Sequence, residues 1–302
     1  MTSDGPDKPQ AKPVQSDLAT RVVSAVVLLA LVFAVLFAGG WVFTQFLCVL
    51  SILAMHEWLT MTAKPQIPAL TRFMISLLPA VFLSAFWDRG AETDNMLIFI
   101  AFALMVVAFV IRFTKAENWA RNTLWCFGGL LYVTAPVLAL YELRGAGVAG
   151  LQTVLIVFII VWAADTAAYF AGRKIGGPKL APSISPGKTW SGALGGLAGA
   201  LIFGFGYLNL VSADISSIGL WAAVILAIAI SSQFGDLFES AVKRHVGVKD
   251  SGNLIPGHGG VLDRIDGLVF AAVFAALIQW SKMACSIEDS GTIAFGLLCP
   301  IS

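Results

Sequence analysis

The chain has 302 residues, of which 58% are hydrophobic and 12% are charged, and its formal net charge is +1. Soluble domains are about 45 to 50% apolar, so this composition predicts an integral membrane protein. The near balance of charge argues against nucleic-acid binding, which needs a clustered excess of Lys and Arg. Lipids and small anions are therefore the expected partners.

The N-terminal residues 1–18 are polar. They contain three prolines and charges of both signs, a composition typical of a disordered arm. A cleaved signal peptide is disfavoured, because the polar lead is long and no small-x-small site follows the first apolar run. We expect this arm to precede a single membrane domain over 19–302, with N-terminal helices in 19–150 and the catalytic half in 151–285.

Nine apolar stretches approach the length of about 20 residues that a membrane-spanning helix needs. The predicted fold class is therefore all-α, a polytopic membrane protein with about nine transmembrane helices. The predicted spans are 22–38, 42–62, 70–87, 95–112, 124–141, 151–170, 191–211, 218–240 and 267–283. A last apolar stretch, 292–301, is too short to be predicted as a span. The single cysteines form no Cys-x-x-Cys pair, which argues against a disulfide framework or a zinc site.

The basic residues divide unevenly between the two sides that these spans define. With the N-terminus in the cytoplasm, sixteen of the 19 Lys and Arg lie on the cytoplasmic side, leaving Arg89, Arg144 and Lys282 on the other. This is the positive-inside pattern. It places the two longest loops, 171–190 and 241–266, in the cytoplasm, where nucleotides and magnesium are available.

The segment 236–266 holds nine of the acidic and basic residues and two of the three histidines. Lipid-facing helices avoid charge, so this segment must lie in water, in a polar cavity or around an ion. If the eighth span continues as a helix, one face carries Asp236, Glu239, Ser240 and Lys243. Such oxygen ligands suit Mg²⁺, and Lys243 and Arg244 would then meet phosphates. The alternative is a solvated helix end.

The loop that follows is rich in glycine, which lets backbone N–H groups approach an anion. Asp263 and Asp266 stand at the start of the ninth span, where they could simply be helix caps, Asp266 more so than Asp263. Brought together, Asp236 and Asp263 would repel one another unless a cation lay between them.

A second polar group surrounds residues 165–190. Asp165 and Tyr169 are spaced i, i+4 near the end of the sixth span, and Gly-Lys-Thr follows at 187–189. A Walker motif is rejected, because position 182 is Pro and the flanks are membrane spans. Ser185, Lys188 and Thr189 instead predict an anion-binding turn at the head of the seventh span.

The remaining polar residues receive structural interpretations. His56 and Glu57 lie in the second span beside Trp58, where they are expected to snorkel toward the membrane surface rather than to act in a site. The scattered histidines are too few for a zinc cluster.

These motifs together resemble a known family. The run Ser240-x-x-Lys243-Arg244-x₄-Lys249-Asp250-x₅-Pro256-x-His258-Gly259-Gly260-x-x-Asp263-Arg264-x-Asp266 is similar to the signature of the phosphatidate cytidylyltransferases, or CDP-diacylglycerol synthases. The upstream runs Asp165-x₃-Tyr169-x-x-Gly172 and Ile184-Ser185-Pro186-x-Lys188-Thr189 also resemble this family. The resemblance is strong over about 150–285 and only general in the N-terminal half.

The resemblance implies a reaction in which CTP and phosphatidic acid give CDP-diacylglycerol and pyrophosphate, with Mg²⁺ required and a monovalent cation such as K⁺ sharing the site. It implies metal ligation by Asp236, Asp263 and Ser240, and catalytic roles for Asp236, Lys243, Arg244, Asp263 and Arg264. The further residues that it implies in substrate binding are Asp165, Tyr169, Arg173, Ser185, Lys188, Thr189, Ser240, Lys249, Asp250, His258, Gly259, Gly260 and Asp266. A bacterial inner membrane is the expected location, and a homodimer is left open.

Two other functions are weighed against this one. A CTP-dependent lipid kinase of the polyprenol type would release CDP instead of pyrophosphate. An ion or lipid transporter would place charges in mid-span in both halves of the chain, whereas here they gather at the cytoplasmic ends.

Overall fold

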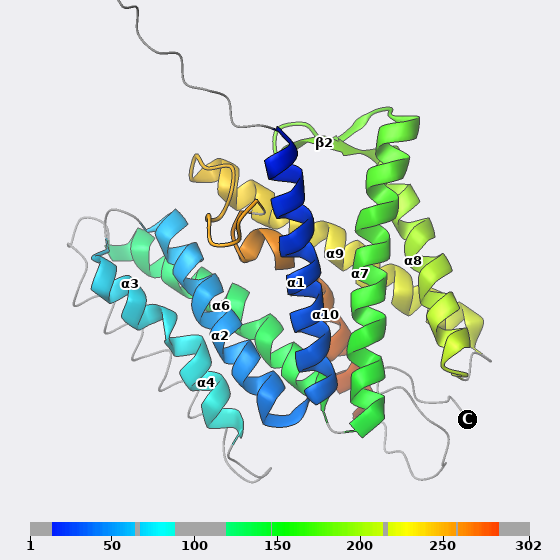
Figure 1. The fold of residues 1–302 in the computed structure, drawn as a ribbon, viewed down its shortest axis with the longest axis horizontal. Coiled ribbons are helices and arrows are strands. Elements are labelled where there is room, and N and C mark those ends of the chain that lie inside the picture. Colours follow the sequence, from blue (N-terminus) through cyan, green and yellow to red (C-terminus); the bar gives the residue numbers. More distant parts are fainter. Residues whose placement is uncertain are drawn as a thin grey trace, which may run out of the picture.

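The structure is a computed structural model that describes residues 14–63, 67–87, 119–145, 147–213, 217–257 and 259–283. Helices dominate the described residues (Figure 1). The helices are α1 (Val14–Ala38), α2 (Gly40–Thr62), α3 (Ala69–Ser76), α4 (Leu78–Trp87), α6 (Trp119–Arg144), α7 (Gly147–Ile175), α8 (Trp190–Leu210), α9 (Ile218–His245) and α10 (Leu262–Met283). Helix α1 thus begins inside the stretch predicted to be a disordered arm. The predicted span 95–112 and the stretch 292–301 lie outside the described residues.

Six of the described helices contain a stretch long and apolar enough to cross a membrane, and these stretches lie in α1, α2, α6, α7, α8 and α9. The predicted span 70–87 is instead divided into α3 and α4 at Leu77. Pro79 explains the division, because proline lacks an N–H donor and clashes with the carbonyl four residues earlier. The fold is therefore that of an all-α polytopic membrane protein, as predicted. The predicted number of nine spans is not confirmed.

Helices α7 and α8 lie side by side and pack closely through small residues (Figure 1). A Cβ atom added at Gly195 of α8 would lie 2.3 Å from the Ala171 Cβ of α7, and one at Gly199 would lie 2.4 Å from the Ala167 Cβ. Small residues allow such close backbone approach between helices in membranes, where lipid tails are as apolar as leucine. The α7–α8 pair therefore forms a closely packed wall of the pocket described below.

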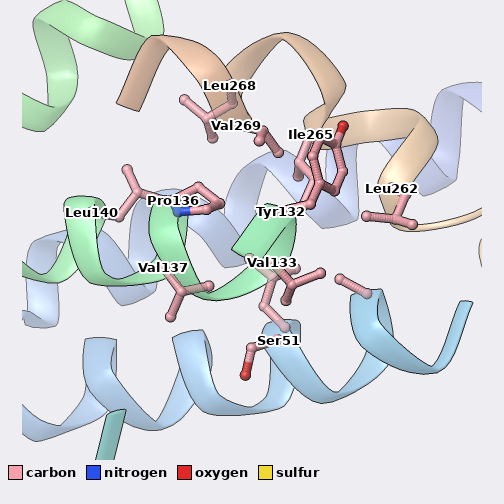
Figure 2. Close-up of a pocket in the computed structure, with 12 residues that line it drawn as sticks. Ser51, Tyr132, Val133, Pro136, Val137, Leu140, Leu262, Ile265, Leu268 and Val269 are labelled. Carbon is pink, nitrogen blue, oxygen red and sulfur yellow. The ribbon is translucent and has the colours of Figure 1, made fainter. Parts of the chain in front are cut away.

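Helices α2, α6 and α10 meet around a small apolar cavity of about 20 Å³ (Figure 2). Ser51 of α2, Tyr132 and Pro136 of α6, and Leu262 and Val269 of α10 line it (Figure 2). This volume is close to that of a single water-sized probe, which makes the cavity a packing defect in the core. Its walls join the N-terminal helices to the first turns of α10.

A short antiparallel hairpin interrupts the helical fold after α7. Strand β1 (Lys179–Ala181) pairs with β2 (Ser185–Thr189), with Lys179 opposite Thr189. The prediction treated 171–190 as a loop, whereas α7 continues to Ile175 and the hairpin fills most of the rest. The hairpin lies at the end of the helices where α1 begins (Figure 1).

The polar junction between α9 and α10 lies at the same end (Figure 1). Helix α9 runs to His245, so the prediction that the eighth span continues as a helix past residue 236 is confirmed. Gly257 and Gly259 in the connecting loop have φ angles of +73° and +81°, a region that favours glycine. The loop thereby turns back so that the N-terminus of α10 faces α9 and α2.

Candidate active site

The hairpin brings Lys188 to α9. Thr189 caps α8, because its hydroxyl accepts a hydrogen bond from the Gly192 N–H at 3.1 Å. This cap, and the pairing of β1 with β2, fix the strand that carries Lys188, whose ammonium forms an ion pair with the Asp236 carboxylate. The side chains of Lys188 and Asp236 are 26% and 32% exposed, so the ion pair is partly buried and still reached by solvent.

An open pocket of about 550 Å³ surrounds this ion pair. Helices α7, α8 and α9 and the hairpin all contribute to its lining. Six residues that the sequence predicts as site residues line it: Asp165, Tyr169, Arg173, Lys188, Thr189 and Asp236. Its walls thus combine acidic, basic and hydroxyl side chains from α7, the hairpin and α9, as a site for a polyanionic substrate requires, while α8 contributes only Gly192 and Ala193.

A second polar cluster, made of Glu239, Lys243 and Asp263, joins α9 to α10. The Lys243 ammonium donates to the Glu239 carboxylate at 3.0 Å and to the Asp263 carboxylate at 2.7 Å. Glu239 is fully buried, and the Tyr132 hydroxyl lies 3.5 Å from its second oxygen. The single Lys243 cation thus binds two carboxylates, and its attraction to them compensates for the cost of burying their charges.

Asp263 has further partners in the connecting loop. Its carboxylate accepts hydrogen bonds from the Ser251 N–H at 3.0 Å and from the Gly260 N–H at 2.8 Å. Burial raises the pKa of Asp263, but the hydrogen bonds from Lys243, Gly260 and Ser251 outweigh it and hold the pKa below its ordinary value. Asp263 is therefore ionised and holds the loop against α10.

The predicted metal ligands Asp236 and Asp263 stand in different ion pairs, with Lys188 and with Lys243. Asp236 has acidic neighbours instead in Asp165 of α7 and Asp266 of α10, which lie within electrostatic range of it. Among the described residues, no group of three His, Cys, Asp or Glu is arranged to hold a metal ion. Asp236 fits a hard cation by its oxygen donors and its place in the pocket, whereas the Asp263 oxygens are already engaged by three donors.

The other predicted residues differ in their contacts and in their exposure. Arg173 donates to the Tyr169 hydroxyl at 2.7 Å, and Arg244 donates to the Ile184 carbonyl of the hairpin at 3.4 Å. Three further predicted residues are exposed: Lys249, Asp250 and Arg264. Four are only partly exposed or buried: Ser185, Ser240, Gly259 and Gly260. His258 lies outside the described residues.

Sequence reasoning missed two residues near these centres. Gln233 lines the pocket one turn before Asp236, and its amide donates to the Ala193 carbonyl of α8 at 3.0 Å. Glu57 was expected to snorkel, and that expectation is wrong: its carboxylate is buried and accepts hydrogen bonds from the Val261 and Leu262 N–H groups. The available signal was a carboxylate inside an apolar span, which marks function by default.

Comparison with known proteins agrees with this architecture. The model of the cytidylyltransferase family matches residues 19–281. A phosphatidate cytidylyltransferase from Brucella suis is 41% identical, with 87% of this chain and 93% of the relative covered. Proteins of the same name from Haemophilus influenzae and Staphylococcus saprophyticus are 39% and 34% identical, covering 85% and 84% of this chain and 96% and 95% of the relatives. We call residues 240–266, whose sequence resembles the family signature, the signature segment. These matches show that the chain belongs to the cytidylyltransferase family.

Proposed function

We propose that this protein is a phosphatidate cytidylyltransferase, which transfers CMP from CTP to phosphatidic acid and releases pyrophosphate. The names of the similar proteins support this activity. One structural observation assigns this activity to particular residues. It is the pocket in which Lys188 of the hairpin and Asp236 of α9 form an ion pair. Its position beside apolar helices suits a reaction between a water-soluble nucleotide and a membrane lipid.

The chemistry brings two polyanions together. A phosphate oxygen of phosphatidic acid attacks the α-phosphorus of CTP, a new P–O bond forms, and the bond to the β-phosphate breaks so that pyrophosphate leaves. Catalysis of such a transfer consists mainly of positioning and charge stabilisation. Lys188 and Arg173 are the basic residues that line the pocket, and we assign them to the phosphates of CTP or of the lipid.

Mg²⁺, when bound, would supply charge neutralisation at the transferred phosphoryl group and the leaving pyrophosphate. We assign Asp236 to hold it, since that carboxylate lines the pocket and has Asp165 and Asp266 for acidic neighbours. Asp263 would join as a ligand, with Ser240 nearby, once Lys243 releases it. A K⁺ ion at the same site is a proposal from the family resemblance alone, and a homodimer stays an open prediction.

We further propose that the pocket faces the cytoplasm of a bacterial inner membrane. Arg173, Lys174, Lys188, Lys243 and Arg244 belong to the helix ends and hairpin at one end of the protein (Figure 1). Clustered basic residues mark the cytoplasmic side. In a chain whose four native cysteines are replaced by serine, a thiol reagent that cannot cross membranes should label a Cys placed at exposed Lys179 only after the cells are opened. Labelling of that Cys in intact cells would contradict this orientation.

The activity is tested on the purified protein in lipid nanodiscs with CTP and phosphatidic acid. We expect equimolar CDP-diacylglycerol and pyrophosphate, identified by mass spectrometry and a pyrophosphate assay, with turnover lost on chelation and restored by Mg²⁺. Formation of CDP would indicate a lipid kinase instead. Flux across liposomes without nucleotide turnover would indicate a transporter. Asp236→Asn is the inactive control, because it removes the pocket carboxylate while keeping its size.

A further inference from the structure

Glu57 of α2 connects the N-terminal helices to the signature segment. It is 7% exposed, and the partners of its carboxylate lie within the loop before α10 and at the first residue of α10. One oxygen accepts the Val261 N–H at 2.9 Å, and the other accepts the Leu262 N–H at 3.0 Å and the Ser251 hydroxyl at 3.2 Å. These contacts span 194 to 205 residues of sequence, so only the tertiary fold can form them.

The contacts place a negative charge at the N-terminus of α10. The first N–H groups of a helix have no partner within the helix, and the helix dipole favours an anion there. A cap normally comes from a residue just before the helix. Here the cap comes from α2, and its charge-assisted hydrogen bonds compensate for burying the carboxylate.

The loop backbone encloses this carboxylate closely. A Cβ atom at Gly260 would lie 2.5 Å from one Glu57 oxygen, and a Cβ atom at Gly252 would lie 2.8 Å from the other. Neither position has room for a side chain while Glu57 stays in place. Two of the signature-segment glycines thus allow the loop to close around Glu57.

The same loop is shared with Asp263. Ser251 gives its hydroxyl to Glu57 and its N–H to Asp263, while Gly260 gives its N–H to Asp263. The two carboxylates therefore hold the same loop, and both of them bind Ser251. The direction of the first turn of α10, which carries Asp263 and Arg264, depends on both of them.

We propose that Glu57 is a positioning residue for cytidylyl transfer: by holding Ser251, Val261 and Leu262, it places Asp263 and Arg264 for the reaction. This inference rests on the proposed function. It also means that a residue of the N-terminal half affects the reaction rate, because displacing reacting groups by about 1 Å can lower a rate about a hundredfold. Glu57 itself does not touch the substrates in this role.

The main test is Glu57→Gln, which keeps the size of the side chain but replaces one acceptor with an N–H₂ group that faces N–H donors. We expect kcat per folded molecule to fall about tenfold or more, as for other residues that orient a site, with KM for phosphatidic acid unchanged. Amide hydrogen exchange over 251–263 should also become faster. Glu57→Asp, which keeps the charge, should restore part of kcat.

The matched control is Arg144→Gln. Arg144 is also buried and donates to the Leu36 carbonyl at 3.0 Å, but it contacts the beginning of α2, about 25 Å along the helix from Glu57. If Glu57 were merely structural, both variants would lose folded protein and neither would lose kcat per folded molecule. We expect only Glu57→Gln to lose kcat.

Ser251→Ala is a second, milder variant that removes one hydrogen bond to Glu57. Its effect on kcat should be smaller, and it should add little in the Glu57→Gln background, because the two residues act together. Wild-type kcat in folded Glu57→Gln, or unchanged exchange over 251–263, would overturn the inference. Absence of pyrophosphate release by the wild-type protein would instead reject the proposed function, and the exchange measurement would still test the positioning.

Discussion

The Lys243 ammonium donates to the Asp263 carboxylate across the junction of α9 and α10, at 2.7 Å. Lys243 is 12% exposed in its side chain and also bonds the fully buried Glu239, so this one cation serves two buried acids. This ion pair joins the C-terminal half of α9 to the first turn of α10. Four pairs of variants test this ion pair, the role of Lys188, the packing of α7 on α8 and the cap of α8.

Lys243→Met should destabilise the protein strongly. It leaves Glu239 and Asp263 buried without their cation, and breaking a buried ion pair in this way costs about 3–5 kcal/mol. The measurement is reversible unfolding in detergent. Lys174→Met, at an exposed position in the last turn of α7, should change stability by less than about 0.5 kcal/mol. Equal stability of the two variants would show that Lys243 does not hold the two acids.

Lys188→Ala should reduce activity while leaving stability nearly intact. Its ion pair with Asp236 is partly solvated and contributes at most about 1 kcal/mol to folding. Loss of a charge that stabilises the transition state typically costs about a hundredfold or more in rate, so kcat/KM for CTP should fall to that extent. Lys179→Ala on the neighbouring strand is the control, and a comparable loss there would mean that general charge matters rather than Lys188.

Gly195→Ala should weaken the packing of α7 on α8. The added methyl group would lie 2.3 Å from the Ala171 Cβ, and overpacking of this kind costs about 1–3 kcal/mol. Gly206→Ala in the same helix meets nothing within 4 Å and should be neutral or stabilising, by up to about 1 kcal/mol. Melting temperatures in nanodiscs compare the pair, and the reverse order would contradict the packing described for α7 and α8.

Thr189→Ala should remove the cap of α8 and cost about 1 kcal/mol, because the Gly192 N–H then lacks its hydroxyl acceptor. Thr189→Ser keeps the hydroxyl and should retain most of the stability. Since Thr189 adjoins Lys188, the alanine variant should also lower kcat/KM for CTP. A serine variant as impaired as the alanine variant would assign the effect to the lost methyl group instead of the cap.

Several features follow from the sequence alone because they depend on local composition. Runs of apolar residues predict α2, α6, α7, α8 and α9 to within a few residues, since a lipid-exposed segment must satisfy its own backbone hydrogen bonds. The spacing of Asp236, Glu239 and Lys243 likewise predicts a shared helical face, and α9 confirms the helix. The signature segment resembles the family from its residues without any knowledge of contacts.

Tertiary structure alone decided which charges meet. The pairing of Lys188 with Asp236 depends on how the hairpin rests on α9, and the capping of α10 by Glu57 joins residues 204 apart or more. No periodicity encodes such contacts, because they arise when packed helices bring distant polar groups into one low-dielectric region where each must find a partner. For this reason Glu57, which was expected to extend to the membrane surface, is instead buried and bonded to Ser251, Val261 and Leu262 of the signature segment.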